Sequence, residues 1–66
     1  MNMKWTDVLE IGICLADLYP DKDPLSINFV ELRQLVVELP GFEDDADRCG
    51  EKVLEAIQAA WIEEAE

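Results

Sequence analysis

The chain has 66 residues, half of them hydrophobic, and its sixteen acidic and five basic side chains give a net charge of −11 at pH 7. This charge repels nucleic-acid phosphates and anionic lipid headgroups, so it excludes nucleic acid and membranes as partners and favours a metal ion or a basic protein surface. The apolar content is too high for a disordered acidic tail, and no apolar run approaches the ~20 residues that cross a bilayer.

The first helix is predicted from about Thr6 to Tyr19. Thr6 is its expected N-cap, and Asp7 then lies in the first turn, where a negative charge complements the helix dipole. The 3.6-residue period assigns to the core side Val8, Ile11, Leu15, Leu18 and Tyr19. An adjacent stripe holds Asp7, Glu10, Cys14 and Asp17. Like charges at this spacing cost helix stability, which hints that the stripe serves another purpose. Leu9 and Ile13 lie outside the apolar sector, and we expect them to meet a neighbouring element.

Pro20 ends this helix, because proline lacks an N–H and disfavours helix in the residue before it. Residues 20–24 form a turn, and residues 25–27 are predicted to be a short extended piece that pairs with Lys4 and Trp5. The second helix begins near Asn28, whose side chain caps it while Glu31 completes a capping box. Its predicted core face holds Phe29, Leu32, Leu35, Val36 and Leu39. A second face, a candidate contact surface, holds Val30, Arg33 and Val37.

Pro40-Gly41 ends the second helix, and residues 43–47 follow as an acidic loop. Asp47 or a neighbour is expected to cap the third helix, which begins near Arg48 or Gly50 and runs to Glu64. Its core stripe holds Val53, Leu54, Ile57, Ala60 and Trp61. We assign Trp5 and Trp61 to the core, because large rings supply much of the buried area of a small domain. The pattern predicts a mainly α, three-helix domain with at most a short strand pair.

The whole chain, residues 1–66, is predicted to be a single domain. Its start lacks the apolar h-region of a secretory signal, so we expect a cytoplasmic protein. Strong self-repulsion favours a monomer. Cys14 and Cys49 are expected to be reduced thiols, because one possible bridge without a secretion signal is weak support for a disulfide scaffold.

Most catalytic constellations are missing from the sequence. Without histidine there is no Ser-His-Asp or Cys-His arrangement, and the three glycines are too far apart for a phosphate loop. A calcium loop starting at Asp21 fails, because Leu25 and Leu32 stand at ligand positions. A domain this small rarely encloses a pocket that separates the pKa values of two carboxylates. We therefore predict a protein that is not an enzyme and that holds no tightly bound cofactor.

Weak binding of Fe²⁺ by surface carboxylates stays open at this point. Oxygen ligands suit hard cations, and the candidate ligands on the first helix are Asp7, Glu10 and Asp17. The alternative is a solvated acidic face, which the sequence alone favours. Cys14 would add a soft ligand, although a lone helical cysteine is more often a small apolar residue.

The chain contains four sequence motifs, which are Lys4-Trp5-Thr6-Asp7 with Glu10-Ile11, Tyr19 to Pro24, Phe29 with Leu39 to Asp45, and Glu51 to Glu64. In order, in register and over nearly all of the chain, these motifs resemble the IscX family. Some positions depart from the family pattern. Leu35 replaces a frequent aromatic residue, Asn28-Phe29-Val30-Glu31 lacks the usual basic residue before Phe and Thr-Asp after it, and Cys49-Gly50 replaces a Ser-Asn that would cap the third helix.

The resemblance implies a winged-helix-like fold, an architecture usually associated with DNA binding but here with the charge inverted. It also implies a partner, the cysteine desulfurase of the cluster assembly system, a pyridoxal-phosphate enzyme that supplies sulfur. Family members bind a basic surface of that enzyme, which the bacterial frataxin-like protein also uses, and they are described as weak iron binders that modulate cluster formation. Carried over to this chain, the partner-binding residues are Lys4, Asp7, Glu10, Asp17, Asp21, Asp23, Glu63, Glu64 and Glu66.

The leading hypothesis is therefore an acidic adaptor of iron–sulfur cluster assembly that docks on the basic patch of a cysteine desulfurase. The second hypothesis is an iron carrier, in which Asp7, Glu10 and Asp17 hold Fe²⁺ for delivery. A third, less favoured hypothesis is a DNA mimic that inhibits a nucleic-acid-binding protein, since the fold would present an acidic body in place of a basic one.

Overall fold

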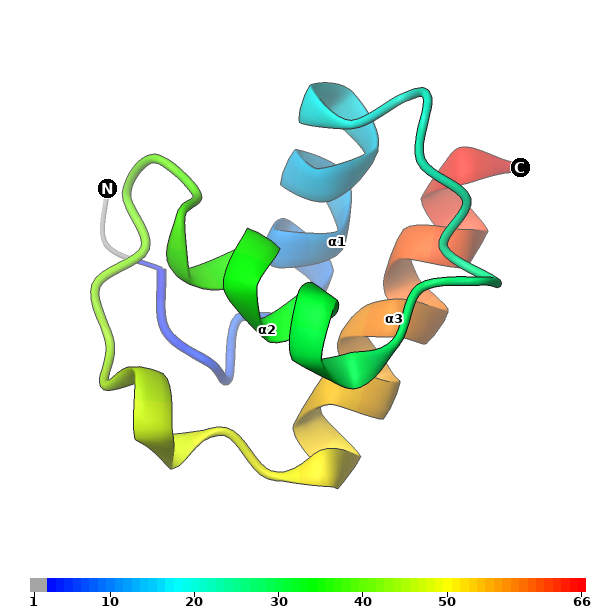
Figure 1. Cartoon of the computed structure of the whole chain (residues 1–66). Helices are drawn as coiled ribbons and strands as arrows, with labels where there is room; N and C mark the ends of the chain where they lie inside the picture. Colours follow the sequence, from blue (N-terminus) through cyan, green and yellow to red (C-terminus); the bar gives the residue numbers. More distant parts are fainter. Residues whose placement is uncertain (1–2) are drawn as a thin grey trace.

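The computed structural model describes residues 3–66 and confirms a mainly helical domain built from three α-helices. They are α1 (Val8–Leu18), α2 (Phe29–Val37) and α3 (Glu51–Ala65), with a short 3-10 turn at Ala46–Arg48 before α3. In Figure 1, α1 and α3 lie side by side and end at the same side of the molecule, while α2 crosses in front of them. The main helix pair is α1 with α3, and α2 packs against both. Within residues 3–66 no helix is long and apolar enough to cross a membrane.

The prediction that residues 25–27 pair with Lys4 and Trp5 is wrong. Among the described residues, β pairing is limited to a parallel bridge between Met3 and Phe42, in which Met3 N–H donates to Gly41 O at 2.7 Å and Glu43 N–H donates to Met3 O at 2.9 Å. Gly41 has a φ of 84°, a conformation that glycine adopts without a steric penalty, and it turns the chain back toward Met3. Residues 25–27 do not pair with Lys4 and Trp5, because their backbone is used in the turn around Asp23.

The helix starts differ from the prediction in two of three cases. Asn28 caps α2 as predicted, and its side chain accepts the Glu31 N–H at 2.8 Å. The N-cap of α1 is Asp7 and not Thr6, and the Asp7 carboxylate accepts the N–H of Lys4 at 2.9 Å instead of a helix N–H. The N-cap of α3 is Gly50, which has no side chain to cap the helix.

Asp47 does not cap α3, because the acidic loop forms its own turn first. The Asp45 carboxylate accepts the Asp47 N–H at 3.0 Å and so caps the 3-10 turn. The chain needs Cys49 and Gly50 in extended conformation to leave this turn before α3 can begin.

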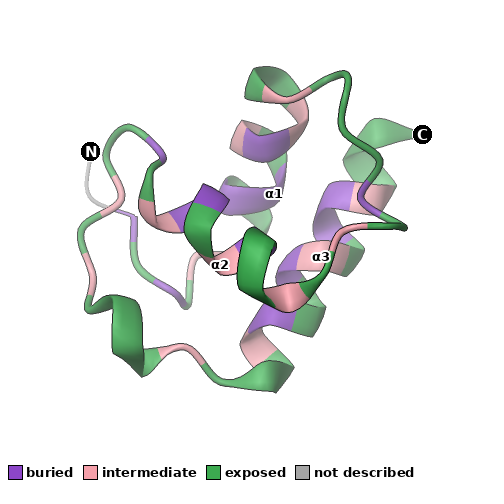
Figure 2. Ribbon diagram, viewed as in Figure 1, coloured by how far each residue is buried: buried purple, intermediate pink, exposed green. Residues whose placement is uncertain are grey.

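The core predicted from the helical period is largely confirmed. Its buried side chains are Met3, Trp5, Ile11, Leu15, Leu32, Leu35, Val36, Leu39, Leu54, Ile57, Ala60 and Trp61 (Figure 2). Val8, Tyr19, Phe29 and Val53 are partly buried against them. Leu18 was assigned to the core and is 51% exposed, because α1 ends there and the chain turns away at Pro20. Leu9 and Ile13, expected to meet a neighbouring element, are also exposed.

The N-terminal segment is fixed to the loop after α2 by Trp5. The Trp5 indole Nε1–H donates to Asp45 O at 2.7 Å, and its ring meets Phe42 edge to face, with centroids 4.8 Å apart. An edge-to-face aromatic pair adds to the stability given by buried area. The assignment of Trp5 and Trp61 to the core is thus confirmed, and Cys14 and Cys49 are free thiols as predicted.

The contact between α1 and α3 depends on Gly12. This glycine is buried, and a Cβ placed on it would lie 2.7 Å from Ala60 Cβ and 3.0 Å from the Ala60 carbonyl carbon. Non-bonded Cβ contacts shorter than 3.0 Å are essentially never observed in proteins, so only glycine allows the two helix backbones to approach this closely. The position therefore sets the spacing of the main helix pair.

We expect Gly12→Ala to destabilise the domain by about 1–2 kcal/mol, because overpacking outweighs the gain in helix propensity of about 1 kcal/mol. Urea unfolding monitored by circular dichroism measures the change. Gly50→Ala is the control, since nothing lies within 4 Å of a Cβ there. The loss of a favoured N-cap glycine and the lower entropy of the unfolded chain act in opposite directions, so the shift in stability should stay below about 0.5 kcal/mol. Equal stability of Gly12→Ala and wild type would show that the helices separate freely.

Candidate functional site

The C-terminal ends of α1 and α3 and the turn after α1 carry most of the predicted partner-binding carboxylates. We call this region the acidic end and define it by Asp17, Asp21, Asp23, Glu63, Glu64 and Glu66, all of which are exposed. Asp17 on α1 and Glu64 on α3 line one groove. Its walls also include Tyr19, Lys22 and Trp61. The tertiary structure thus brings together acidic side chains that lie 47 residues apart in the sequence, counted from Asp17 to Glu64.

The helix dipoles add to the negative potential of the acidic end. The C-terminal end of a helix carries the equivalent of about half a negative charge, which basic side chains in the last turn usually offset. Neither α1 nor α3 has a basic residue in its last turn, and both helices end here. The negative charges of the carboxylates therefore add to the negative ends of the helix dipoles, and this repulsion destabilises the folded state.

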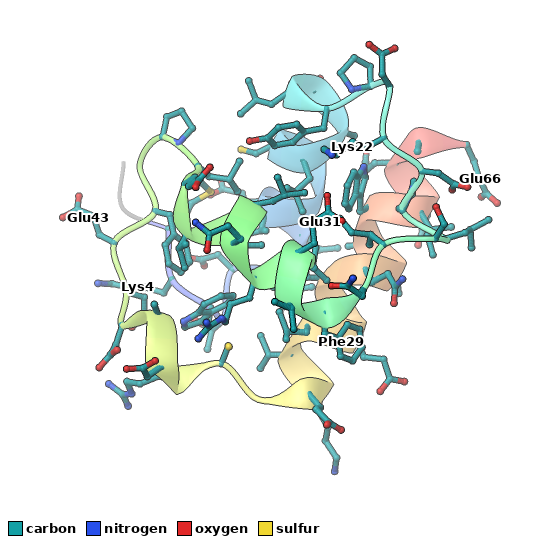
Figure 3. The ribbon with its side chains drawn as sticks, viewed as in Figure 1. Lys4, Lys22, Phe29, Glu31, Glu43 and Glu66 are labelled. Atoms are coloured by element: carbon teal, nitrogen blue, oxygen red, sulfur yellow. The ribbon has the colours of Figure 1, made fainter. Side chains whose placement is uncertain are left out.

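Lys22 is the one basic residue among the turn residues 20–24. Its ammonium group forms an ion pair with Glu31 at 3.1 Å, toward α2 (Figure 3). The turn itself is fixed to α3, because the Gln58 side-chain amide donates to Pro24 O at 2.7 Å and Pro24 is buried. The acidic end is therefore a positioned surface with a single basic side chain, Lys22, which is paired with Glu31.

The remaining predicted site residues, Lys4, Asp7 and Glu10, lie at the other end of α1. Figure 3 shows Lys4 and Glu43 on the side of the molecule opposite Lys22 and Glu66, and the Lys4 ammonium donates to the carbonyl oxygen of Glu43. Since a helix rises 1.5 Å per residue, Asp7 and Asp17 are about 15 Å apart along α1. The predicted site is thus divided into two groups, at the two ends of one helix.

The predicted iron ligands are not gathered around one point. Among residues 3–66 no three side chains of the types His, Cys, Asp and Glu lie close enough together to hold a metal ion. Asp7, Glu10 and Asp17 follow α1 along its length, and metal–oxygen bonds of about 2 Å cannot span such a distance. Weak binding of iron by one or two exposed carboxylates stays a prediction.

A second, mostly apolar groove lies between α1 and the segment after α2. It is lined by Met3, Glu10, Ile13, Cys14, Pro40 and Gly41. The thiol of Cys14 lies 3.9 Å from the sulfur of Met3. Sequence reasoning missed this groove, although the position of Leu9 and Ile13 outside the apolar sector was a signal that α1 has a second apolar stripe.

Asp44 links the acidic loop to the N-terminal segment. Its carboxylate accepts the backbone N–H of Trp5 at 3.1 Å and that of Asp45 at 2.8 Å. These two hydrogen bonds hold the pKa of Asp44 below its usual value, and the positive charges of Lys4 and Arg48 act in the same direction. Not every carboxylate of this chain is therefore free for a partner, since this one stabilises the fold.

Comparison with known proteins bears on the same residues. A family model described as "Iron-sulphur cluster assembly" matches residues 3–66. A protein of Pseudomonas aeruginosa, named "Uncharacterized protein PA3808", is 67% identical to this chain over 64 residues, which are 97% of either chain. The matched range includes all four sequence motifs from Lys4 to Glu64.

The lowered pKa of Asp44 predicts a pH-dependent contribution to stability. Because the folded-state pKa lies below the unfolded value, the contribution is present above the unfolded value of 3.8 and is lost as the pH falls through the folded-state pKa. Asp44→Asn should lower the thermal unfolding midpoint at pH 7, and the difference from wild type should shrink as the pH falls below 3.8 and the Asp44 carboxylate becomes protonated.

Asp21→Asn controls for the loss of one negative charge, because no hydrogen bond within the described residues uses the Asp21 carboxylate. It should be neutral or slightly stabilising at pH 7, since it reduces self-repulsion. If both variants change the midpoint equally at pH 7, the hydrogen bonds to Asp44 do not stabilise the fold.

Proposed function

Because the chain belongs to the iron–sulphur cluster assembly family, we propose that it acts in this process as an acidic adaptor that docks on a basic surface of a cysteine desulfurase. Family membership gives the role in cluster assembly and confirms the resemblance seen in the sequence motifs. The partner, the surface that binds it and the effect on sulfur or iron delivery are the content of the proposal. In this proposal the protein is a cytoplasmic monomer and not an enzyme.

The observation that carries the proposal is the uncompensated charge of the acidic end. Six carboxylates belong to the C-terminal ends of α1 and α3 and to the turn after α1, and Asp17 and Glu64 share a groove. The one basic side chain of that groove, Lys22, is paired with Glu31. Folding alone does not favour this arrangement, because like charges repel and acidic groups at helix C-termini are destabilising. A basic protein surface would turn this repulsion into attraction when it binds.

Electrostatic docking of this kind would mainly act on the rate of association. Complementary charges raise association rates above the usual 10⁵–10⁶ M⁻¹s⁻¹ by roughly two or more orders of magnitude at low salt, and screening removes the advantage. A regulator that is brought in by charge can share one basic surface with another acidic protein. We propose that this chain competes there with the frataxin-like protein and so modulates cluster formation.

The proposal predicts that binding to the desulfurase of the same organism weakens as salt rises. Asp17→Lys with Glu64→Lys should reduce the affinity at least tenfold at low salt and flatten its salt dependence, because each reversal replaces an attraction by a repulsion. Isothermal titration calorimetry at two salt concentrations measures both effects. These two positions are suitable, since no hydrogen bond within the described residues uses either carboxylate.

Glu38→Lys with Glu55→Lys is the matched control, because it changes the net charge by the same amount at exposed positions away from the acidic end. It should weaken binding much less than the pair at the acidic end. Equal losses would mean that net charge alone matters, and salt-independent affinity of the wild type would contradict the docking mechanism.

We also propose that Fe²⁺ is held weakly and exchangeably on exposed carboxylates of this chain, including Asp7, Glu10 and Asp17. The negative potential of the surface raises the local concentration of cations even without a built site. Anaerobic titration with Fe²⁺ should broaden amide NMR signals along α1 and at the acidic end, in a manner that salt suppresses. Broadening of a single small cluster that resists salt would instead indicate a specific metal site.

A further inference from the structure

The outward side of α1 carries an apolar stripe that the fold does not use. Leu9 is 74% exposed and Ile13 is 44% exposed, and they are one helical turn apart. Residues four apart are neighbours on a helix surface, so the two side chains form one patch. Isolated exposed apolar residues are common, but Ile is also a poorer helix former than Ala or Glu, so helix stability does not explain Ile13 at an exposed position.

Ile13 forms the ridge between the two grooves described above. One groove reaches from Ile13 past Cys14 and Met3 to Pro40, and the other reaches from Ile13 to Trp61 and Glu64. The apolar surface therefore runs from Ile13 to the segment after α2, and the groove toward α3 is lined mainly by polar and charged groups. Leu9 extends the apolar surface by one turn toward the start of α1.

Acidic side chains outnumber basic ones at the edge of this apolar surface. Glu10 lines the first groove. Asp17 and Glu64 line the second together with Lys22, whose ammonium group is paired with Glu31. An apolar centre with a polar rim is the usual anatomy of a protein–protein interface. The charge of the rim selects the occupant, since a protein surface with apolar side chains inside a ring of Lys and Arg would match it.

The same charge opposes two other occupants. A lipid bilayer with anionic headgroups would be repelled by the rim. A second copy of this chain would bring Glu10, Asp17 and Glu64 of two molecules together, each with a net charge of −11. Like charges placed face to face cost several kcal/mol and suppress such pairings.

We infer that Leu9 and Ile13 are the apolar centre of the surface that binds the desulfurase, and that the basic patch of the partner has apolar side chains at its middle. This inference rests on the proposed function. It assigns different roles in binding to the carboxylates and to the apolar side chains. The carboxylates bring the partner in quickly, and the apolar centre holds it, because short-range packing acts mainly on the dissociation rate.

The test is a pair of substitutions that remove the apolar stripe without disturbing the helix. Leu9→Gln and Ile13→Gln keep side-chain length and good helix propensity. Together they should weaken desulfurase binding by roughly tenfold to a hundredfold, as expected when two buried aliphatic side chains become polar. The loss should lie in the dissociation rate, measured by surface plasmon resonance, and should leave the salt dependence of the affinity unchanged.

Leu25→Gln is the control. This side chain is 73% exposed but lies outside both grooves of α1, so binding should stay within about twofold of wild type. The unfolding midpoint of each variant is measured in parallel, and it should not fall, because every substituted side chain is exposed.

The outcomes separate the inference from the proposal beneath it. If wild type binds the desulfurase with salt dependence but Leu9→Gln with Ile13→Gln binds equally well, the inference is wrong and electrostatic docking stands. If wild type does not bind the desulfurase at low salt, both fall. If wild type forms a dimer by sedimentation at high salt and the variant does not, the stripe serves self-association and the inference is overturned.

Discussion

The close contact of α1 with α3 at Gly12 sets the spacing of the two helices that form the acidic end. The backbones approach so closely there that a single additional carbon would meet Ala60 at 2.7 Å. Because the helices are that close and end on the same side, their last turns form one groove with Asp17 on one wall and Glu64 on the other. With a larger residue at position 12, the backbones of α1 and α3 would have to move apart.

A net charge of −11 on 66 residues opposes folding, and specific contacts in the loops offset part of this repulsion. Trp5 is buried against Phe42 and donates to Asp45, while Asp44 accepts two backbone N–H groups. Lys22 and Arg33 form ion pairs with Glu31 and Asp47. These contacts use basic groups and hydrogen-bond donors to stabilise the loops, and the acidic end keeps its charge. A surface left charged at a cost in stability is typical of a binding site.

The charged and apolar side chains of α1 would have complementary roles in the proposed adaptor. Long-range attraction brings a basic partner to the correct side of the molecule but gives little discrimination between basic surfaces. In the proposed complex, Leu9 and Ile13 would supply a short-range contact that depends on the shape of the partner. Affinity and specificity would then come from different residues of one helix.

The sequence by itself determined the number of helices, the cap at Asn28, most core positions and the family, because these depend on local periodicity, on side-chain capping and on ordered motifs. It did not determine the pairing of Met3 with Phe42, since that depends on the positive φ of Gly41 and on Asp23 using the backbone of residues 25–27. It also misplaced Leu18, Leu9 and Ile13, because period alone does not tell which side of a helix a neighbour will cover. The gathering of Asp17 with Glu64, and the separation of both from Asp7, were decided only by tertiary structure, since helix packing and helix length set distances that spacing in the sequence does not contain.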